Sequence, residues 1–406
     1  MTILLSDNVI SSLGFTTEEN YRNVKQGVCG LTFFDNRYEL PEPFMASEID
    51  EAMLEKAFLK ISDDYSGLLE KRNIDEEKRN DFLDTRKRAK YSKLEKAAIV
   101  SIAEALKGTA IDTTDDNNVL FILSTTKGNV FLLDENEKDG YQQEQLYLWH
   151  SAKLISEFFG NSNSTFVVSN ACISGASALI TAQRELQSRR CQYAIVTGID
   201  VLSKFIITGF QSFKALSQEV CKPFDANRAG LNIGEAVATM ILTERPAGMC
   251  NSGDIEFTAG AMRNDANHIS GPSRTGDGAY LALHFVLSGI DPEEIAFVCA
   301  HGTATPYNDE MESVALTRAE LKDRPVYSLK GYFGHTLGAA GVLESVISVW
   351  ALKEGTILKT LGCDTPDVVY PLDVVMENRN TTKRRCIKML SGFGGCNAAL
   401  LFTKLY

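Results

Sequence analysis

Residues 165–178 form the stretch on which the fold depends, and they read Thr-Phe-Val-Val-Ser-Asn-Ala-Cys-Ile-Ser-Gly-Ala-Ser-Ala. Phe166, Val167 and Val168 predict a buried strand, because aromatic and β-branched residues favour the extended conformation. The small residues from Ser174 onward begin a segment with helical propensity. A strand that passes directly into a helix is the unit from which α/β folds are built.

Cys172 lies between that strand and that helix. The first N–H groups of a helix have no partner within the helix, and the helix dipole is positive there, so both stabilise a thiolate. The sequence therefore favours a nucleophilic cysteine with a lowered pKa. The alternative is a small buried apolar residue, which is a common role for a free cysteine.

Composition limits the class of protein. The chain has 406 residues, of which 44% are hydrophobic, so it can bury a large core in two or three domains. Its net charge of −12 argues against nucleic acid as the main partner. Its nine cysteines include no C-x-x-C pair, which is typical of reduced thiols and predicts no metal site.

The sequence also bears on location. Residues 1–5 lack the basic and apolar regions of a signal peptide, and no run approaches the roughly 18–20 apolar residues of a membrane span. We therefore expect a cytoplasmic protein with no membrane span.

Strands alternate with helices along most of the chain, which predicts a sheet with helices on its faces. Residues 245–248, Arg-Pro-Ala-Gly, predict a boundary between an N-terminal half (1–247) and a C-terminal half (248–406). A charged region at about 35–90 is predicted as inserted amphipathic helices. Two similar halves packed face to face would place strand-end loops from both around one site.

Two of the five histidines lie in glycine-flanked loops that follow strands. His301 opens a tight loop in which Thr303 and Thr305 can orient its ring, and His335 lies where small residues let another segment come close. One histidine at a strand end is often structural. Two of them, with Lys330 nearby, favour proton transfer or hydrogen bonding to a developing oxyanion.

Two further features accompany the histidines. Lys330 and Glu344 lie on either side of His335 and can pair to hold this segment in place. Residues 392–395, Gly-Phe-Gly-Gly, leave the backbone N–H of Phe393 accessible, which suits an oxyanion hole shared with the N–H of Cys172. The alternative for the second feature is an ordinary glycine-rich turn.

A basic stretch interrupts the acidic chain. Ten basic residues lie between Lys71 and Lys96, and they include Arg86, Lys87, Arg88 and Lys90. They form either a solvated helix face or a docking patch for an acidic partner.

Four motifs together carry a family resemblance: residues 170–176 around Cys172, residues 300–306 around His301, Lys330 with residues 334–341 around His335, and residues 392–397 around Phe393. In order and separation they resemble the elongating β-ketoacyl-acyl carrier protein synthases of the thiolase superfamily. The resemblance covers most of the chain except about residues 35–90.

This resemblance implies a thiolase-like fold of two similar α/β halves in an αβαβα arrangement. It also implies a homodimer, with a heterodimer as an alternative, and no metal or organic cofactor. The implied reaction is a decarboxylative Claisen condensation between a cysteine-bound acyl chain and malonyl-acyl carrier protein, in fatty acid or polyene- or polyketide-like lipid synthesis.

The resemblance also implies roles for individual residues. Cys172 takes the acyl chain, and the N–H groups of Cys172 and Phe393 hold the tetrahedral oxyanion. His301 and His335 promote malonyl decarboxylation and stabilise the enolate, while Lys330 with Glu344 orders the histidine loop. The basic residues Arg86, Lys87, Arg88 and Lys90 dock acyl carrier protein.

Three departures concern the substrate: Cys396 replaces the usual hydroxyl residue, residues 331–333 are bulky, and residues 124–129 are polar. Two other functions stay open. A thiolase would act on acyl-coenzyme A, although Lys330 and Thr305 point away from it. A pocket-shaping partner subunit of a ketosynthase would lack the reactive cysteine, which is present here.

Overall fold

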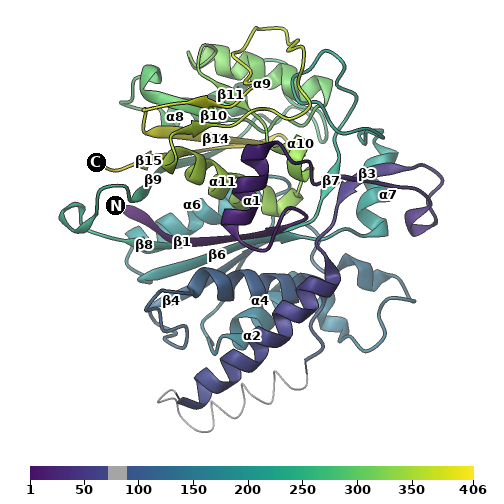
Figure 1. Cartoon of the computed structure of the whole chain (residues 1–406), viewed down its shortest axis with the longest axis vertical. Helices are drawn as coiled ribbons and strands as arrows, with labels where there is room; N and C mark the ends of the chain where they lie inside the picture. Colours follow the sequence, from purple (N-terminus) through teal and green to yellow (C-terminus); the bar gives the residue numbers. More distant parts are fainter. Residues whose placement is uncertain (72–88) are drawn as a thin grey trace.

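The computed structural model describes residues 1–71 and 89–406, and it has five layers in which three layers of helices alternate with two layers of strands (Figure 1). The described strands of the main sheet run in the order β11 (Val326–Tyr327), β10 (Ile295–Cys299), β14 (Arg385–Gly392), β15 (Cys396–Lys404), β9 (Ile255–Asn264), β1 (Thr2–Ser11), β8 (Ala236–Glu244), β6 (Tyr193–Asp200), β4 (Val119–Ser124) and β5 (Phe166–Val168). Two small sheets comprise β2 (Thr32–Phe34), β3 (Phe44–Ser47) and β7 (Ile233–Gly234), and β12 (Thr356–Ile357) with β13 (Arg379–Asn380).

The main sheet consists of two five-strand sets with the same topology. In the set β1-β8-β6-β4-β5 the first two pairings are antiparallel and the last two parallel, and the set β9-β15-β14-β10-β11 repeats this pattern. Among the described strands, the two sets pair with each other through β1 and β9, where Ile3 pairs with Glu256 and Leu4 with Ile255. The two similar α/β halves expected from the sequence are therefore confirmed. The domain boundary between residues 247 and 248, within the turn from β8 to β9, stays a prediction.

The helices cover both sets and fill the space between them (Figure 1). The outer layers are α2 (Glu51–Lys71), α4 (Lys93–Leu106) and α5 (Leu148–Phe158) on one side, and α8 (Asp277–Val286) and α9 (Pro306–Arg318) on the other. The central layer holds α6 (Ser174–Gln187) and α11 (Ala340–Lys353), with α1 (Thr17–Gln26) beside α11. Two further helices, α7 (Lys204–Ser212) and α10 (Lys330–Phe333), lie in loops.

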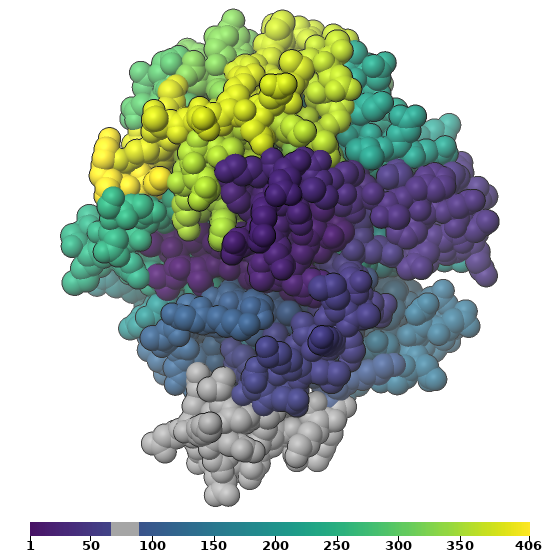
Figure 2. Space-filling model, viewed as in Figure 1, coloured from purple at the N-terminus to yellow at the C-terminus, as the bar shows by residue number. Residues whose placement is uncertain are grey.

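The space-filling view shows how the chain closes this central layer. On the face in Figure 2 the N-terminal residues (purple) fill the middle of the surface, between the C-terminal segment and the layer that contains α2 and α4. Within residues 1–71 and 89–406, no helix is long and apolar enough to cross a membrane.

The region at about 35–90 includes strand β3 as well as helix α2. Helix α2 buries Leu54, Phe58 and Ile61, while Met53 and Leu59 are exposed. The extent of an inserted helical region stays a prediction. Of the predicted docking residues, Arg86, Lys87 and Arg88 lie outside the described residues. Lys90 is described, and its ammonium group donates to the carbonyl of Asp139 at 2.6 Å while lying over the ring of Tyr141.

Strand β5 differs from its prediction as well. Its three residues are only half-buried, because β5 is the last strand of the sheet and, within residues 1–71 and 89–406, pairs only with β4. The apolar composition of residues 166–168 indicated a buried strand, but composition does not reveal which strand will lie at an edge.

The central helices meet backbone to backbone. A Cβ atom added at Gly341 would lie 2.3 Å from the backbone nitrogen of Ala176, and one added at Gly175 would lie 2.8 Å from that of Val342. Only glycine permits this approach, which locks the start of α6 against the start of α11.

We expect Gly341→Ala to lower the free energy of unfolding by roughly 1–3 kcal/mol, because the added methyl group overlaps backbone that has nowhere to move. The urea midpoint measures this. Gly209→Ala in α7 is the matched control: it meets no atom within 4 Å and should stabilise the helix. Equal midpoints for both variants would contradict the proposed close contact.

Candidate active site

A strained turn presents Cys172 between β5 and α6. Ala171, just before it, has φ 44°, a left-handed conformation that is costly for a residue with a Cβ atom. The Ser174 hydroxyl holds the turn, since it accepts from the Asn170 N–H at 2.8 Å and donates to the Ala171 carbonyl at 2.6 Å. The thiol is thereby fixed immediately before the start of α6.

The loop after β10 presents His301. A carboxylate of α9, Glu312, accepts hydrogen bonds from the N–H groups of His301 and Gly302, both at 2.7 Å. Gly302 has φ 46° and packs against Ser328, so a side chain does not fit there. The hydroxyls of Thr303 and Thr305 bond to each other at 2.8 Å. The anchor found for the loop is therefore Glu312, which sequence reasoning missed.

The loop after α10 presents His335. Its N–H donates to the Asn232 carbonyl at 2.6 Å, and Gly334 before it has φ 70°. The ring Nδ1 accepts from the N–H of Leu337 at 3.3 Å, which assigns the ring proton to Nε2. That Nε2 is buried and has no hydrogen-bond partner among the described residues, so it can donate to a bound molecule.

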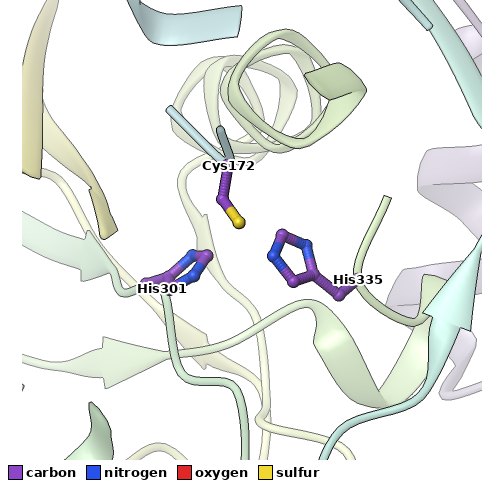
Figure 3. A group of neighbouring side chains, drawn as sticks. All are labelled: Cys172, His301 and His335. Carbon is purple, nitrogen blue, oxygen red and sulfur yellow. The ribbon is translucent and has the colours of Figure 1, made fainter. Parts of the chain in front are cut away.

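The structure brings these three side chains together. One ligand-type atom from each of Cys172, His301 and His335 lies within 4.8 Å of the others, and all three residues are buried. The two imidazole rings meet edge to face, with centroids 5.0 Å apart. Figure 3 shows the sulfur of Cys172 pointing between the two rings.

A cavity of about 400 Å³ leads to this cluster, and Thr303 and Thr305 are among its lining residues. Phe393 stands at its wall with 38% of its surface exposed, in a ring cluster with Phe210 and Phe213. The cavity offers a mainly apolar route to the sulfur.

The glycine-rich turn contacts the cysteine. The backbone N–H of Phe393 forms a hydrogen bond to the Cys172 thiol, and a Cβ atom at Gly392 would lie 3.1 Å from the Cys172 backbone nitrogen. The thiol of Cys396 donates to the Phe393 carbonyl at 3.0 Å, so it holds the turn as a hydroxyl would. The backbone N–H groups of Phe393 and Cys172 thus lie near the Cys172 sulfur.

Behind the histidines lies a buried cluster of ion pairs. Glu344 binds Lys330 through one carboxylate oxygen and Lys388 through the other. The sequence suggested the first pair, whereas Lys388 was missed because it stands alone in the apolar strand β14. A single lysine within an apolar strand was the sequence signal that could have identified Lys388.

Burial overturns the expectation of a lowered pKa for Cys172. Desolvation raises the pKa of this thiol to about 11, and Lys330, the Phe393 N–H and Lys127 offset only part of that rise. The start of α6 lies close by, but loss of water outweighs it. Cys172 is therefore a neutral thiol at neutral pH.

Both histidines are neutral as well. Desolvation lowers the pKa of His301 and of His335 well below the usual value, and the positive charges of Lys330 and Lys388 lower both further. Each ring thus has one N–H donor and one acceptor nitrogen at neutral pH.

The sulfur and two imidazoles are also the donor types that bind zinc. Here they lie beside two buried ammonium groups, whose positive charge disfavours a bound cation.

Sequence comparison identifies the class of protein that this fold and site define. Residues 8–247 match the family described as Beta-ketoacyl synthase, N-terminal domain, and residues 256–364 match Beta-ketoacyl synthase, C-terminal domain. The chain belongs to the β-ketoacyl synthase family. It is an acyltransferase with β-ketoacyl synthase activity, on a thiolase-like fold.

Individual relatives agree with this class. A mitochondrial 3-oxoacyl-(acyl-carrier-protein) synthase of Arabidopsis thaliana is 32% identical over 62% of this chain and 59% of its own length. The 3-oxoacyl-(acyl-carrier-protein) synthase 2 of Synechocystis sp. is 33% identical over 58% of this chain and 60% of its own. A chain from the complex of ketosynthase ApeO with its chain length factor ApeC, from Xenorhabdus doucetiae, superposes with TM-score 0.83 and 22% identity, covering 99% and 98% of the two chains.

We expect alkylation of Cys172 by iodoacetamide to accelerate about tenfold per pH unit from pH 7 to 9.5 without reaching a plateau, because only the thiolate reacts and its pKa is raised. Peptide mass spectrometry follows the modified cysteine, and Cys172→Ala identifies background. An alkylation rate that reaches a plateau below pH 8 would show that burial does not raise the pKa of the Cys172 thiol.

Proposed function

We propose that this chain catalyses the decarboxylative Claisen condensation of an acyl chain bound to Cys172 with malonyl-acyl carrier protein. One observation carries the proposal: a buried thiol at a strained strand-to-helix turn lies within 4.8 Å of two neutral imidazoles. Covalent catalysis divides the transfer into two easier steps that need only these groups.

The first step is acyl transfer to sulfur. The Cys172 sulfur attacks the thioester carbonyl of the incoming acyl group, and its proton passes to the neutral imidazole of His301. The N–H groups of Cys172 and Phe393 stabilise the tetrahedral oxyanion. The bond to the carrier thiol then breaks, and the carrier thiol takes the proton and leaves.

The second step makes the carbon nucleophile. Malonyl thioester loses carbon dioxide, and the electron pair of the broken C–C bond moves into an enolate. The free Nε2–H of His335 and the His301 ring donate hydrogen bonds to its oxygen. The enolate carbon attacks the acyl-cysteine carbonyl, and the C–S bond to Cys172 breaks as the β-ketoacyl product forms. The departing Cys172 thiolate takes up one proton from solvent, which restores the neutral thiol.

The surrounding residues hold the two imidazoles. Lys330 and Glu344 form a buried ion pair that joins the loop before His335 to α11, which follows it. Thr303 and Thr305 line the cavity, where they can contact the arm of a carrier-bound substrate. None of these groups need exchange a proton with substrate.

Acyl carrier protein is the partner that this reaction requires. The basic residues Arg86, Lys87, Arg88 and Lys90 would attract an acidic carrier, and this docking role stays a prediction. Fatty acid synthesis and polyene- or polyketide-like lipid synthesis are both consistent with the site. The cytoplasmic location also stays a prediction, since the Arabidopsis relative is named as mitochondrial.

The edge strand β5 supports assembly into a dimer. Its residues Phe166, Val167 and Val168 are apolar and half-buried, and within the described residues β5 has one strand neighbour. Such an edge pairs readily with another strand. A second copy of this chain is the proposed occupant, and a chain length factor is the alternative, because ApeO is found with one.

Incubation with acyl-acyl carrier protein should add one acyl mass to the wild-type chain and none to Cys172→Ala, because the sulfur is the only acceptor in the proposed first step. Intact mass spectrometry measures the adduct. An adduct that persists in Cys172→Ala would exclude this nucleophile, and no adduct on the wild type would favour a pocket-shaping partner subunit.

Replacing either imidazole should slow carbon dioxide release from malonyl-acyl carrier protein by about 10²–10⁴-fold, because a neutral donor to the enolate is lost. The variants are His301→Ala and His335→Ala, measured by coupled release of carbon dioxide; His284→Ala on the exposed end of α8 is the control. Condensation of acyl- and acetyl-coenzyme A, with none from malonyl-acyl carrier protein, would instead establish a thiolase.

A further inference from the structure

A lysine is buried in the middle of β14. Lys388 has 0% of its surface exposed, and its neighbours in the strand are Ile387 and Met389. A charged ammonium group is rarely buried unless ion pairs and hydrogen bonds replace the water it loses. Its partners therefore indicate why the chain keeps a charge at this position.

Three acceptors surround this ammonium group. It forms an ion pair with Glu344 and donates to the backbone carbonyls of Ala300 at 2.8 Å and Cys299 at 3.3 Å. These three partners match in number the three N–H donors of an ammonium group. Lys388 is thus held between one carboxylate and two carbonyls.

The acceptors of Lys388 connect to both histidine loops. Ala300 immediately precedes His301, and Glu344 also binds Lys330, which lies at the start of the helix before His335. Lys388 therefore connects the end of β10 to α11, and through Glu344 to the second histidine loop.

We propose that Lys388 is a positioning residue for the decarboxylation step, which fixes the His301 loop through the Ala300 and Cys299 carbonyls and ties it to Glu344. This inference rests on the proposed roles of His301 and His335. One ammonium group thereby joins both histidine loops to a single carboxylate.

The same charge acts on the protonation of the imidazoles. The charged and titratable groups that face them are Lys330 of α10, Glu344 of α11, Glu312 and Asp309 of α9, Lys388 of β14 and Cys172 before α6. Lys388 lowers the pKa of both rings, after desolvation and Lys330. Its removal would raise both pKa values, so the rings would become protonated at a higher pH.

The central variant is Lys388→Met, which keeps most of the side-chain length and removes the charge. We expect the rate of carbon dioxide release from malonyl-acyl carrier protein to fall by about tenfold to a hundredfold, because small displacements of reacting groups are costly. In a plot of this decarboxylation rate against pH, the fall at low pH (the acid limb) should begin at a higher pH, because the pKa values of the two histidines rise. Acyl transfer to Cys172, followed by intact mass, should fall less.

Two further variants separate positioning from packing. Cys386→Ala removes a fully buried side chain from the same face of β14 and should change neither the acid limb nor the ratio of the two rates. Lys388→Arg keeps the charge but misfits the three acceptors, so decarboxylation should slow while the acid limb stays in place. This variant decides the question if Lys388→Met does not fold.

Two results would overturn the inference. In the first, Lys388→Met slows carbon dioxide release and acyl transfer equally, and the low-pH limb of the decarboxylation rate does not move. In the second, Lys388→Arg and Lys388→Met shift that low-pH limb by the same amount. His301→Ala separates this failure from failure of the proposed function. Normal decarboxylation by His301→Ala would refute the assigned histidine roles, whereas an inactive His301→Ala beside a normal Lys388→Met would refute only the role of Lys388.

Discussion

The site depends on one contact, the approach of two helix backbones at Gly175 and Gly341. Helix α6 begins two residues after Cys172, and α11 begins five residues after His335. Among the described strands, the two five-strand sets pair with each other through two residues each of β1 and β9, and α6 and α11 pack against strands of both sets. The packed helix starts therefore contribute to the distance between the sulfur and the imidazole.

Burial determines the chemistry once that geometry is fixed. Desolvation keeps the Cys172 thiol neutral, although a helix start and Lys330 lie nearby. Desolvation and the charges of Lys330 and Lys388 together keep both imidazoles neutral. The charges of Lys330 and Lys388 are balanced by Glu344, and Glu312 adds negative charge beside the His301 loop. In such surroundings a hydrogen bond to a developing oxyanion is stronger than it would be in water.

Much of the fold and the central site could be predicted from sequence, because their signals are local. Strand-to-helix alternation indicated the layers, and glycine-flanked loops after strands marked His301 and His335. The half-buried state of β5 was not predictable, because it depends on what the rest of the chain places beside that strand.

Electrostatics was harder to predict than topology. A cysteine before a helix suggested a low pKa, but the depth of burial, which no local pattern reveals, reversed the direction. Lys388 was missed for a related reason: its three partners come from residues 299, 300 and 344, which are distant from it in sequence.

The raised pKa of Cys172 has a consequence between turnovers. Peroxides and other electrophiles attack thiolates, while neutral thiols react slowly. Because burial keeps the Cys172 thiol protonated at neutral pH, the same burial protects this sulfur from oxidation.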